Sequence, residues 1–244
     1  MFINIIMKKK ASTVGLIICL LLAASYNYFQ DDINRFINEL TGNVPVYSDD
    51  IKSVIDYDGT SKYVVINNNE PNFFEDDLTT KSFEFYSDLD YLDRCGVAMA
   101  NIGIDLMPTE ERGEIGSVKP SGWHTVKYDF ISGNYLYNRC HLIGYQLTGE
   151  NANKKNLITC TRSTNTGIML EYENMVANYI KETKNHVLYR VTPVFKDTNL
   201  VASGIQMEAM SVEDTGKGIK FNIYIYNVED GVDIDYKTGE SKAR

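Results

Sequence analysis

The most regular alternation of apolar and polar positions in this chain lies between residues 164 and 180. Apolar residues recur there at steps of three and four, which is the period of one face of an α-helix. They are Ile168, Met169, Tyr172, Met175, Val176, Tyr179 and Ile180. Ser163 and Thr164 stand at the start of this segment and are of the type that caps a helix N-terminus. The pattern predicts one amphipathic helix over residues 164–180.

Runs of β-branched and aromatic residues predict strands on both sides of this helix. They cover residues 63–67, 82–86, 134–138, 187–195, 201–212 and 220–228. Short turns join the last three runs, which favours antiparallel pairing. The run over residues 134–138 leads directly into Arg139, Cys140 and His141. We therefore expect an α+β fold with an antiparallel β-sheet core.

Other segments show weaker patterns. Residues 33–40 predict a short helix, whereas residues 90–107 are weakly helical with two glycines inside, so their class stays open. Residues 113–124 contain three glycines and a proline and predict a loop, and residues 149–155 predict a polar connection. The chain has no internal repeat, low-complexity tract or linker, which indicates one domain.

The N-terminus has the order of parts that is typical of a secretory signal peptide. Three consecutive lysines precede an apolar run over residues 14–24, and small residues end at Ser25. A retained membrane anchor is the alternative, but a spanning helix needs about 20 apolar residues. We predict a signal peptide over residues 1–25, a single mature domain over residues 26–244, and a secreted, extracellular protein without stable membrane association.

Export would place the remaining cysteines in an oxidising environment. Cys95, Cys140 and Cys160 remain after Cys19 is lost with the signal. Three thiols allow at most one internal bridge, and their spacing leaves open which pair forms. The apolar fraction of 43% is ordinary for a globular protein, so apolar packing must carry the fold.

The acidic charge of the chain is unevenly distributed. The formal net charge is −9, and it becomes −12 when the three lysines of the signal are removed. Residues 94–162 contain eight basic and six acidic side chains, a net charge of +2, so the rest of the full chain carries −11. A less acidic middle suits local binding of phosphate, although ordinary fluctuation of charge along a sequence explains the same numbers.

Two residues near the middle of the chain have the chemistry that phosphodiester hydrolysis needs. His141 lies where a predicted strand ends, and Asn165 lies at the start of the predicted helix. If strand, loop and helix fold back on one another, the imidazole faces the carboxamide across a narrow gap. Imidazole suits the activation of water near neutral pH. An amide oxygen can hold Mg²⁺ while water and substrate complete its ligands.

Three further side chains are candidates for the same site. Along a regular helix, Glu173 lies roughly 80° round from Asn165, whereas Glu171 lies roughly 240° away. Glu173 is therefore the candidate for binding the water ligands of a metal, and Glu171 is expected to face solvent. Arg139 and Arg162 flank the proposed gap and offer planar donors for phosphate oxygens, although an arginine at a loop edge is most often an ordinary surface residue.

Two motifs resemble those of the DNA/RNA non-specific endonucleases, a family of the ββα-metal (His-Me finger) superfamily. The run Asn-Arg-Cys-His over residues 138–141 falls on the family signature Asp-Arg-Gly-His. Asn165 follows Asn156 by nine residues and precedes Glu173 by eight, and both spacings are those of the family. The double spacing is more specific than a lone histidine or asparagine.

Two longer segments, residues 116–124 and 141–165, are similar to the secreted, phage-encoded DNases of streptococci, the streptodornases. The resemblance extends from about residue 94 to residue 235. It implies a ββα-metal motif with His141 as the general base, Asn165 as the metal ligand, and Mg²⁺ or Mn²⁺ as the cofactor. It also implies cleavage of DNA with little sequence preference, with RNA as a second candidate substrate.

The chain departs from the family pattern in this region. Asn138 replaces an aspartate, which removes a negative charge near the metal, and Cys140 replaces a glycine, which adds a side chain beside the base. Cys160 also stands where related enzymes have glycine. A disulfide between Cys140 and Cys160 that braces the loop is therefore a hypothesis.

Three alternatives use the same residues differently. Cys140 as a nucleophile would make a secreted cysteine hydrolase, although its neighbour His141 should point to the opposite face of the strand. A structural zinc site would use Cys95, Cys140, His141 and Cys160, but it lacks the paired cysteine spacing of zinc fingers. An exported binding or adhesion protein would use some of the 17 tyrosines and 10 phenylalanines for contacts. We favour the endonuclease, and a monomer.

Overall fold

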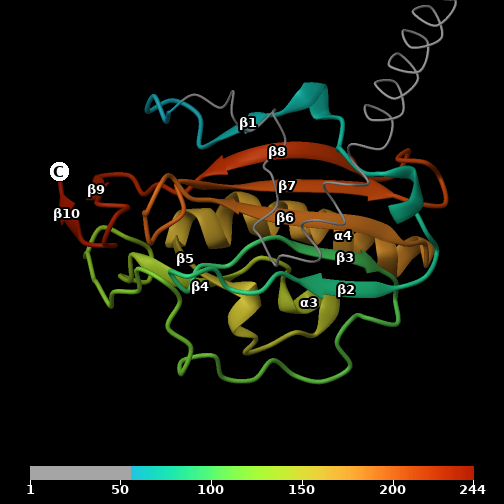
Figure 1. Ribbon diagram of the computed structural model, residues 1–244, viewed down its shortest axis with the longest axis horizontal. Helices are drawn as coiled ribbons and strands as arrows, with labels where there is room; N and C mark the ends of the chain where they lie inside the picture. Colours follow the sequence, from blue (N-terminus) through green and yellow to red (C-terminus); the bar gives the residue numbers. More distant parts are fainter. Residues whose placement is uncertain (1–55) are drawn as a thin grey trace, which may run out of the picture. The chain divides into compact units, whose positions relative to one another are not determined.

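A six-stranded antiparallel sheet forms the centre of the described structure (Figure 1). The computed structural model of the chain describes residues 56–244. The strand order is β1-β8-β7-β6-β3-β2, and all neighbours are antiparallel. The strands are β1 (Tyr63–Val65), β2 (Phe83–Tyr86), β3 (Ala98–Ile102), β6 (Val187–Val194), β7 (Gly204–Ser211) and β8 (Lys220–Tyr226). The predicted signal peptide and the helix predicted over residues 33–40 lie outside the described residues, so the domain boundary at residue 26 stays a prediction.

Most strands lie within the apolar runs of the sequence. Strands β6, β7 and β8 occupy the last three predicted runs, and their antiparallel pairing is confirmed. Residues 90–107, whose class the sequence leaves open, contain strand β3. Ala98, Ala100 and Ile102 of this strand all belong to the core, as the two-residue period of a strand requires. Pairing with two neighbours therefore outweighs the weak helical pattern.

The two faces of the sheet differ in chemistry. One face carries the apolar core residues of every second position along β3, β6, β7 and β8. The other face carries polar side chains beside a smaller apolar cluster, with an ion pair of 2.7 Å between Arg190 and Glu208 and a hydrogen bond of 2.7 Å from Gln206 to Asn222. Buried polar groups need partners of this kind, and the pairs on this face supply them.

Helix α4 (Leu170–Thr183) covers this apolar face and lies behind the sheet in Figure 1. A π-helical turn, η4 (Thr164–Met169), precedes it, and Gly167 within the turn has non-helical angles of φ −98° and ψ −109°. The helix predicted over residues 164–180 is therefore two pieces joined at a break. The buried residues of α4 are Glu173, Val176, Ala177 and Ile180.

Two details of the helix prediction are wrong. Met175 belongs to the predicted apolar face but is 46% exposed, because the buried stripe of α4 runs through Glu173 and the positions three, four and seven residues later. The Ser163 side chain makes no cap. Instead, Ser163 Oγ donates to the Val228 carbonyl at 2.9 Å and Thr164 Oγ1 to the Tyr226 carbonyl at 3.2 Å. These bonds attach the start of η4 to the end of β8.

A separate two-stranded sheet precedes the helix. Strand β4 (Tyr137–His141) begins later than predicted and ends on His141, and β5 (Leu157–Thr161) pairs with it antiparallel. The sequence patterns do not reveal β5, because all five of its residues are buried and no alternation of apolar and polar positions marks such a strand. The strands β4 and β5 followed by η4 and α4 form a ββα motif, as the fold prediction requires.

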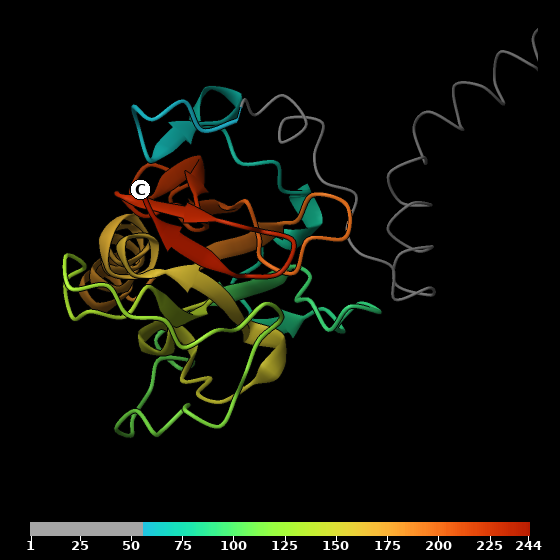
Figure 2. The same cartoon turned by 90° about the vertical axis from the view of Figure 1, so that its left-hand side faces the viewer.

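Shorter elements complete the described part of the chain. Helix α3 (Tyr145–Thr148) and the 3-10 turn η3 (Lys154–Asn156) connect β4 to β5, and the 3-10 turns η1 (Asn67–Asn69) and η2 (Glu75–Asp77) follow β1. Strands β9 (Val232–Ile234) and β10 (Ser241–Ala243) form the red hairpin at the C-terminus in Figure 2. Residues 113–124 form a loop, as predicted. Within residues 56–244, no helix has the length and apolar character needed to span a bilayer.

Candidate active site

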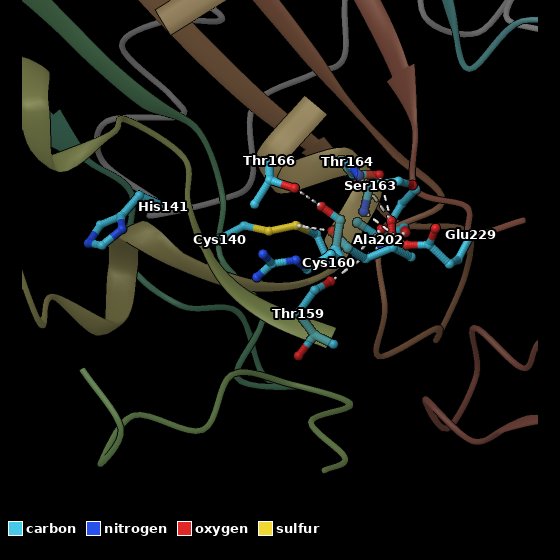
Figure 3. The surroundings of a disulfide bond; sticks show 12 residues. Cys140, His141, Thr159, Cys160, Ser163, Thr164, Thr166, Ala202 and Glu229 are labelled. Atoms are coloured by element: carbon cyan, nitrogen blue, oxygen red, sulfur yellow. Dashed lines mark hydrogen bonds between the residues drawn. A yellow bond between two sulfur atoms is a disulfide. The ribbon is translucent and has the colours of Figure 1, made fainter. Parts of the chain in front are cut away.

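A disulfide and His141 lie on opposite faces of the β4–β5 hairpin. Cys140 is bonded to Cys160, with their Cα atoms 5.9 Å apart, and both are fully buried in the main core. His141 points away from the disulfide (Figure 3), because successive side chains of a strand alternate. The hypothesised Cys140–Cys160 bridge is confirmed, and it joins the two strands directly behind His141.

The disulfide contradicts two of the alternatives. Because Cys140 is oxidised and fully buried, it cannot act as a nucleophile, so the cysteine hydrolase interpretation is wrong. The zinc site is also wrong, since two of its four ligands are bonded to each other and the third, Cys95, is a buried thiol whose pKa burial raises to about 12. Among residues 56–244, no group of three or more His, Cys, Asp or Glu could hold a metal.

The hydrogen bonds of His141 determine which ring nitrogen can accept a proton. Nε2 lies 2.7 Å from the carbonyl oxygen of Asn151, and because a carbonyl only accepts, Nε2 carries the hydrogen. Nδ1 is then the acceptor, and Arg112 Nη2 donates to it at 3.3 Å. Burial lowers the pKa of His141 to about 4, the Arg112 charge acts in the same direction, and the Asn151 bond opposes it. A neutral ring with its lone pair on Nδ1 is the form that a general base needs.

Arg112 is the site residue that sequence reasoning misses. It lies in the loop between β3 and β4, and it is exposed overall although its guanidinium reaches His141. Its positive charge also acts on Glu173, whose pKa it lowers. Arg112 therefore contacts His141 directly and acts on Glu173 through its charge. No sequence signal distinguishes Arg112 from an ordinary surface arginine, because its contacts come from segments far along the chain.

Glu173 occupies the space that a glycine leaves free. A Cβ atom added to Gly144 would lie 2.6 Å from Glu173 Oε2. Interactions with the Gly144 N–H and the Gln146 side chain lower the pKa of this carboxyl group. Burial is the largest influence on this group and raises the pKa of Glu173 to about 8. Glu171, by contrast, is exposed, as the helical geometry predicts.

The two asparagines with the family spacing have different surroundings. Asn156 is fully buried and clamps the loop after β4, because its side chain accepts from the Ile143 N–H and donates to the Ile143 carbonyl, both at 2.9 Å. Asn165 lies in η4 and is half-buried, and its side chain makes no hydrogen bond to any described residue. The hydrogen-bond partners of His141 among the described residues are Arg112 and Asn151, not Asn165. A free amide oxygen at this position is available for a ligand.

Arg139 holds the loop of residues 116–123 against the hairpin. Its guanidinium donates to the carbonyls of Val118 and Gly116, the latter at 2.9 Å, and lies 4.0 Å from the centre of the Trp123 ring. Arg139 and His141 share one face of β4, since they are two residues apart. Because loop carbonyls already occupy two of its nitrogens, a phosphate contact of Arg139 stays a prediction.

Arg162 lies just beyond β5 and packs against the turn that precedes β4. A Cβ atom added to Gly133 would lie 3.3 Å from Arg162 Cζ. The Arg162 Nε atom is buried without a hydrogen-bond partner among the described residues. A buried charged donor without a partner is costly, so this position favours an anionic ligand. The phosphate contact of Arg162 stays a prediction.

The oxygen donors of this site fit a hydrated divalent cation. Mg²⁺ keeps several water ligands and commonly uses only one or two protein oxygens, and the free carboxamide of Asn165 supplies one. Glu173 is a buried carboxyl group with a raised pKa, and a cation near it would favour its ionised form. The residues do not fit a closed thiolate or imidazole site of the zinc-finger type.

Comparisons with known proteins support the same assignment. Residues 72–213, more than half of the chain, match the DNA/RNA non-specific endonuclease family. The structure of NucA from Streptococcus agalactiae with a magnesium ion bound is 27% identical, with a TM-score of 0.65, and the match covers 74% of this chain and 86% of that one. The structure of Sda1 nuclease with a bound zinc ion is 28% identical, with a TM-score of 0.56 and coverage of 66% and 81%.

These matches confirm the resemblance that the motifs indicate. They also contradict the binding-protein alternative, because the matching family and the similar structures are nucleases. The antiparallel sheet with its ββα motif agrees with them. The chain belongs to the DNA/RNA non-specific endonuclease family, and it is an endonuclease.

Proposed function

We propose that the mature protein is a secreted endonuclease that hydrolyses phosphodiester bonds of DNA with little sequence preference. The observation that carries this proposal is the orientation of His141, whose Nε2–H binds the Asn151 carbonyl and leaves the Nδ1 lone pair beside Arg112. Secretion is supported by the predicted signal peptide over residues 1–25 and by the Cys140–Cys160 disulfide, which is typical of an oxidising compartment.

His141 acts as the general base. Nδ1 accepts a proton from the water that attacks phosphorus, and the ring becomes positively charged in that step. The Asn151 carbonyl stabilises this charge, because Nε2–H donates to it over 2.7 Å. The lowered pKa of His141 keeps the ring unprotonated at neutral pH, so the whole population of enzyme is ready to accept a proton.

Arg112 binds the phosphate that is cleaved. Without substrate, its Nη2 donates to His141 Nδ1, the atom that must accept the proton. A phosphate oxygen is a stronger acceptor than a neutral imidazole, so substrate draws the guanidinium away from Nδ1 and frees the lone pair. Arg162 and Arg139 bind neighbouring phosphates. Contacts of this kind carry no base information, which is why little sequence preference is expected.

Asn165 would hold the divalent cation, Mg²⁺ or Mn²⁺, and Glu173 would bind water ligands of that cation. A bound cation supplies neutralisation of the phosphate charge and stabilisation of the leaving oxygen. Magnesium in the NucA structure and zinc in the Sda1 structure support a metal requirement. Digestion of DNA and RNA across a series of metal ions tests which ion this chain uses and whether RNA is a second substrate.

The test is digestion of plasmid DNA and of RNA by the wild-type mature protein and by His141→Ala, with Mg²⁺, Mn²⁺ and a chelator. We expect nicking and then linearisation with Mg²⁺ or Mn²⁺, no cleavage with the chelator, and a loss of about 10³-fold or more in His141→Ala. The matched control is His186→Ala. His186 lies outside the proposed site, where its Nδ1 is 2.7 Å from Glu213 Oε1. Intact plasmid after long incubation with metal, or full activity of His141→Ala, would contradict the proposal.

A second variant tests the assignment of Asn165 as the metal ligand. Asn165→Ala should shift the cleavage rate to higher Mg²⁺ concentration while circular dichroism stays that of the wild type, because the side chain makes no hydrogen bond that the fold needs. Asn178→Ala, on an exposed position of α4, is the control. An unchanged Mg²⁺ dependence of Asn165→Ala would remove Asn165 from the metal site.

A further inference from the structure

The turn of residues 127–135, which precedes β4, carries an exposed aromatic ring beside a cation. Lys127 and Tyr135 face each other in an isolated antiparallel bridge, and the Tyr128 N–H donates to the Asn134 carbonyl at 2.8 Å. Tyr135 is 44% exposed, and Lys127 Nζ lies 4.6 Å from the centre of its ring. A single exposed aromatic residue is ordinary on a protein surface, so its neighbours decide whether the ring has a use.

Arg162 adds a second cation to this turn. Its backbone N–H donates to the Leu136 carbonyl at 2.8 Å. Its guanidinium lies against Gly133, where an added Cβ atom would be 3.3 Å from Arg162 Cζ. Arg162 therefore contacts the chain on both sides of Tyr135. Its buried Nε atom has no hydrogen-bond partner among the described residues, and a buried charged donor in this state is costly. An anionic ligand would supply the partner.

The ring and the two cations together fit a single strand of nucleic acid. Residues 127–135 with Arg162 contain two basic side chains and one acidic side chain, Asp129, whereas the whole chain has a net charge of −9. Proteins that bind single strands combine cations for the phosphates with aromatic rings on which bases stack. In a duplex, neighbouring base pairs cover both faces of a base. Only an unpaired base can therefore stack on Tyr135.

The turn lies at the end of the β4–β5 hairpin that is opposite to His141. Tyr137, the first residue of β4, pairs with Thr161, the residue before Arg162, and His141 is the last residue of β4. At about 3.4 Å per residue, the two ends of β4 are roughly 14 Å apart. A strand with about 3.4 Å between successive phosphates covers this length with about four nucleotides. One strand can therefore reach both His141 and the turn.

We propose that Tyr135, Lys127 and Arg162 form a subsite for an unpaired segment of nucleic acid. One base stacks on the Tyr135 ring, and Arg162 and Lys127 bind the phosphates beside that base. The subsite holds the strand several nucleotides away from the phosphate that is cleaved, so Tyr135 does not touch the reacting atoms. This proposal rests on the proposed nuclease function and assigns to it a strand with unpaired bases as the ligand of the turn.

The test measures binding without cleavage, in the presence of a chelator. Fluorescence anisotropy follows a labelled oligothymidylate of about 20 nucleotides, long enough to cover a typical single-strand site, and a duplex of the same length. The variants are Tyr135→Ala, which removes the ring, Tyr135→Phe, which keeps it, and Arg162→Ala. The matched control is Phe85→Ala, because Phe85 is 54% exposed and lies on the edge strand β2. Circular dichroism checks that each variant is folded.

We expect Tyr135→Ala to weaken single-strand binding about 10-fold, the scale of one base stacked on an aromatic ring. Duplex binding by this variant should stay that of the wild type. Tyr135→Phe and Phe85→Ala should bind both ligands like the wild type. For the single strand, Arg162→Ala should reduce the slope of log K against log salt by about 0.7, the value of one phosphate contact. Tyr135→Ala should leave this slope unchanged, because the ring carries no charge.

Three results would overturn the proposal. Wild-type single-strand binding by Tyr135→Ala overturns the subsite alone, since the nuclease function is tested separately by cleavage with His141→Ala. An equal loss of single-strand and duplex binding in Tyr135→Ala would show that the ring does not select unpaired bases, and it also overturns the subsite. Absence of binding to either ligand by the wild type, together with intact plasmid in the cleavage test, overturns both the subsite and the proposed function.

Discussion

The six-stranded sheet buries mainly apolar side chains on its helix-facing side, whereas the β4–β5 hairpin and the helix after it bury polar side chains together with apolar ones. Ile205, Met207 and Ile223 of the sheet have no exposed surface. In the ββα motif, His141 is 6% exposed and Glu173 8%. The motif also contains the Cys140–Cys160 disulfide.

This difference separates stability from geometry. Apolar burial is non-directional and tolerates repacking, so the sheet can supply free energy of folding without fixing single atoms. Buried polar groups need a particular partner at a particular distance, so the motif can hold the atoms that react. Substitutions in the sheet should therefore lower stability, and substitutions in the motif should lower the cleavage rate.

The largest effect on stability is expected for Ile223→Ala in β8. The fully buried side chain leaves a cavity, so the free energy of unfolding should fall by about 4 kcal/mol. Cleavage by the protein that remains folded should stay close to that of the wild type. Denaturant titration and plasmid cleavage at low temperature measure both. Val65→Ala in β1, where the side chain is 56% exposed, is the control, with a change of about 0.5 kcal/mol or less. A folded but inactive Ile223→Ala would contradict the conclusion that the sheet supplies stability and the motif supplies the geometry of the site.

Removal of the disulfide should have the next largest effect. As for substitutions in the sheet, we expect this change in the motif to lower stability rather than the cleavage rate. The bridge closes a loop with a sequence separation of 20, so Cys140→Ala with Cys160→Ala should cost about 3 kcal/mol of stability. Cleavage should persist at temperatures where the variant is folded, because His141 lies on the other face of β4. A reducing agent should lower the unfolding midpoint of the wild type and leave that of the variant unchanged. Equal midpoints of variant and oxidised wild type would refute a stabilising role.

Gly144→Ala should reduce the rate and leave stability nearly intact. Its backbone angles of φ −59° and ψ 144° suit alanine, but the new Cβ would meet Glu173 Oε2 at 2.6 Å and displace the carboxylate. Misplacement of about 1 Å can cost about 100-fold in turnover. Gly116→Ala is the matched control, because nothing lies within 4 Å of its added Cβ. Wild-type kcat in Gly144→Ala would mean that the position of Glu173 is unimportant.

The smallest effect is a pH dependence of stability in metal-free protein. The pKa of Glu173 is raised from 4.5 to about 8 in the folded state, so folded protein holds a proton that unfolded protein has lost. Raising the pH from 6.5 to 8 should therefore lower the free energy of unfolding by about 2 kcal/mol. The pKa of His141 is lowered from 6.5 to about 4 in the folded state. The stability that this residue contributes is therefore lost as the pH falls from 6.5 to 4, which is below the pH range of the Glu173 effect. Glu173→Gln should lack the loss between pH 6.5 and 8, and an identical loss in that variant would exclude Glu173 as its source.

The local periodicity of apolar residues predicts those strands and that helix in which buried and exposed positions alternate. Residues 187–195, 201–212 and 220–228 contain β6, β7 and β8, and the period of three and four residues places α4. The spacing of Asn156, Asn165 and Glu173 indicates the family from the sequence. These features depend on neighbours within one strand or one helix turn, so a linear pattern records them.

Only the tertiary structure shows the features that depend on residues distant in the chain. Strand β5 is buried on every side and therefore carries no alternation. The contact of Arg112 with His141 and the fit of Glu173 against Gly144 arise when the loop after β3, the loop after β4 and α4 meet. The sequence by itself determined the fold class, the family and the residue types of the site. Which atoms face one another was decided by packing, because burial and hydrogen bonding between distant segments leave no period in the sequence.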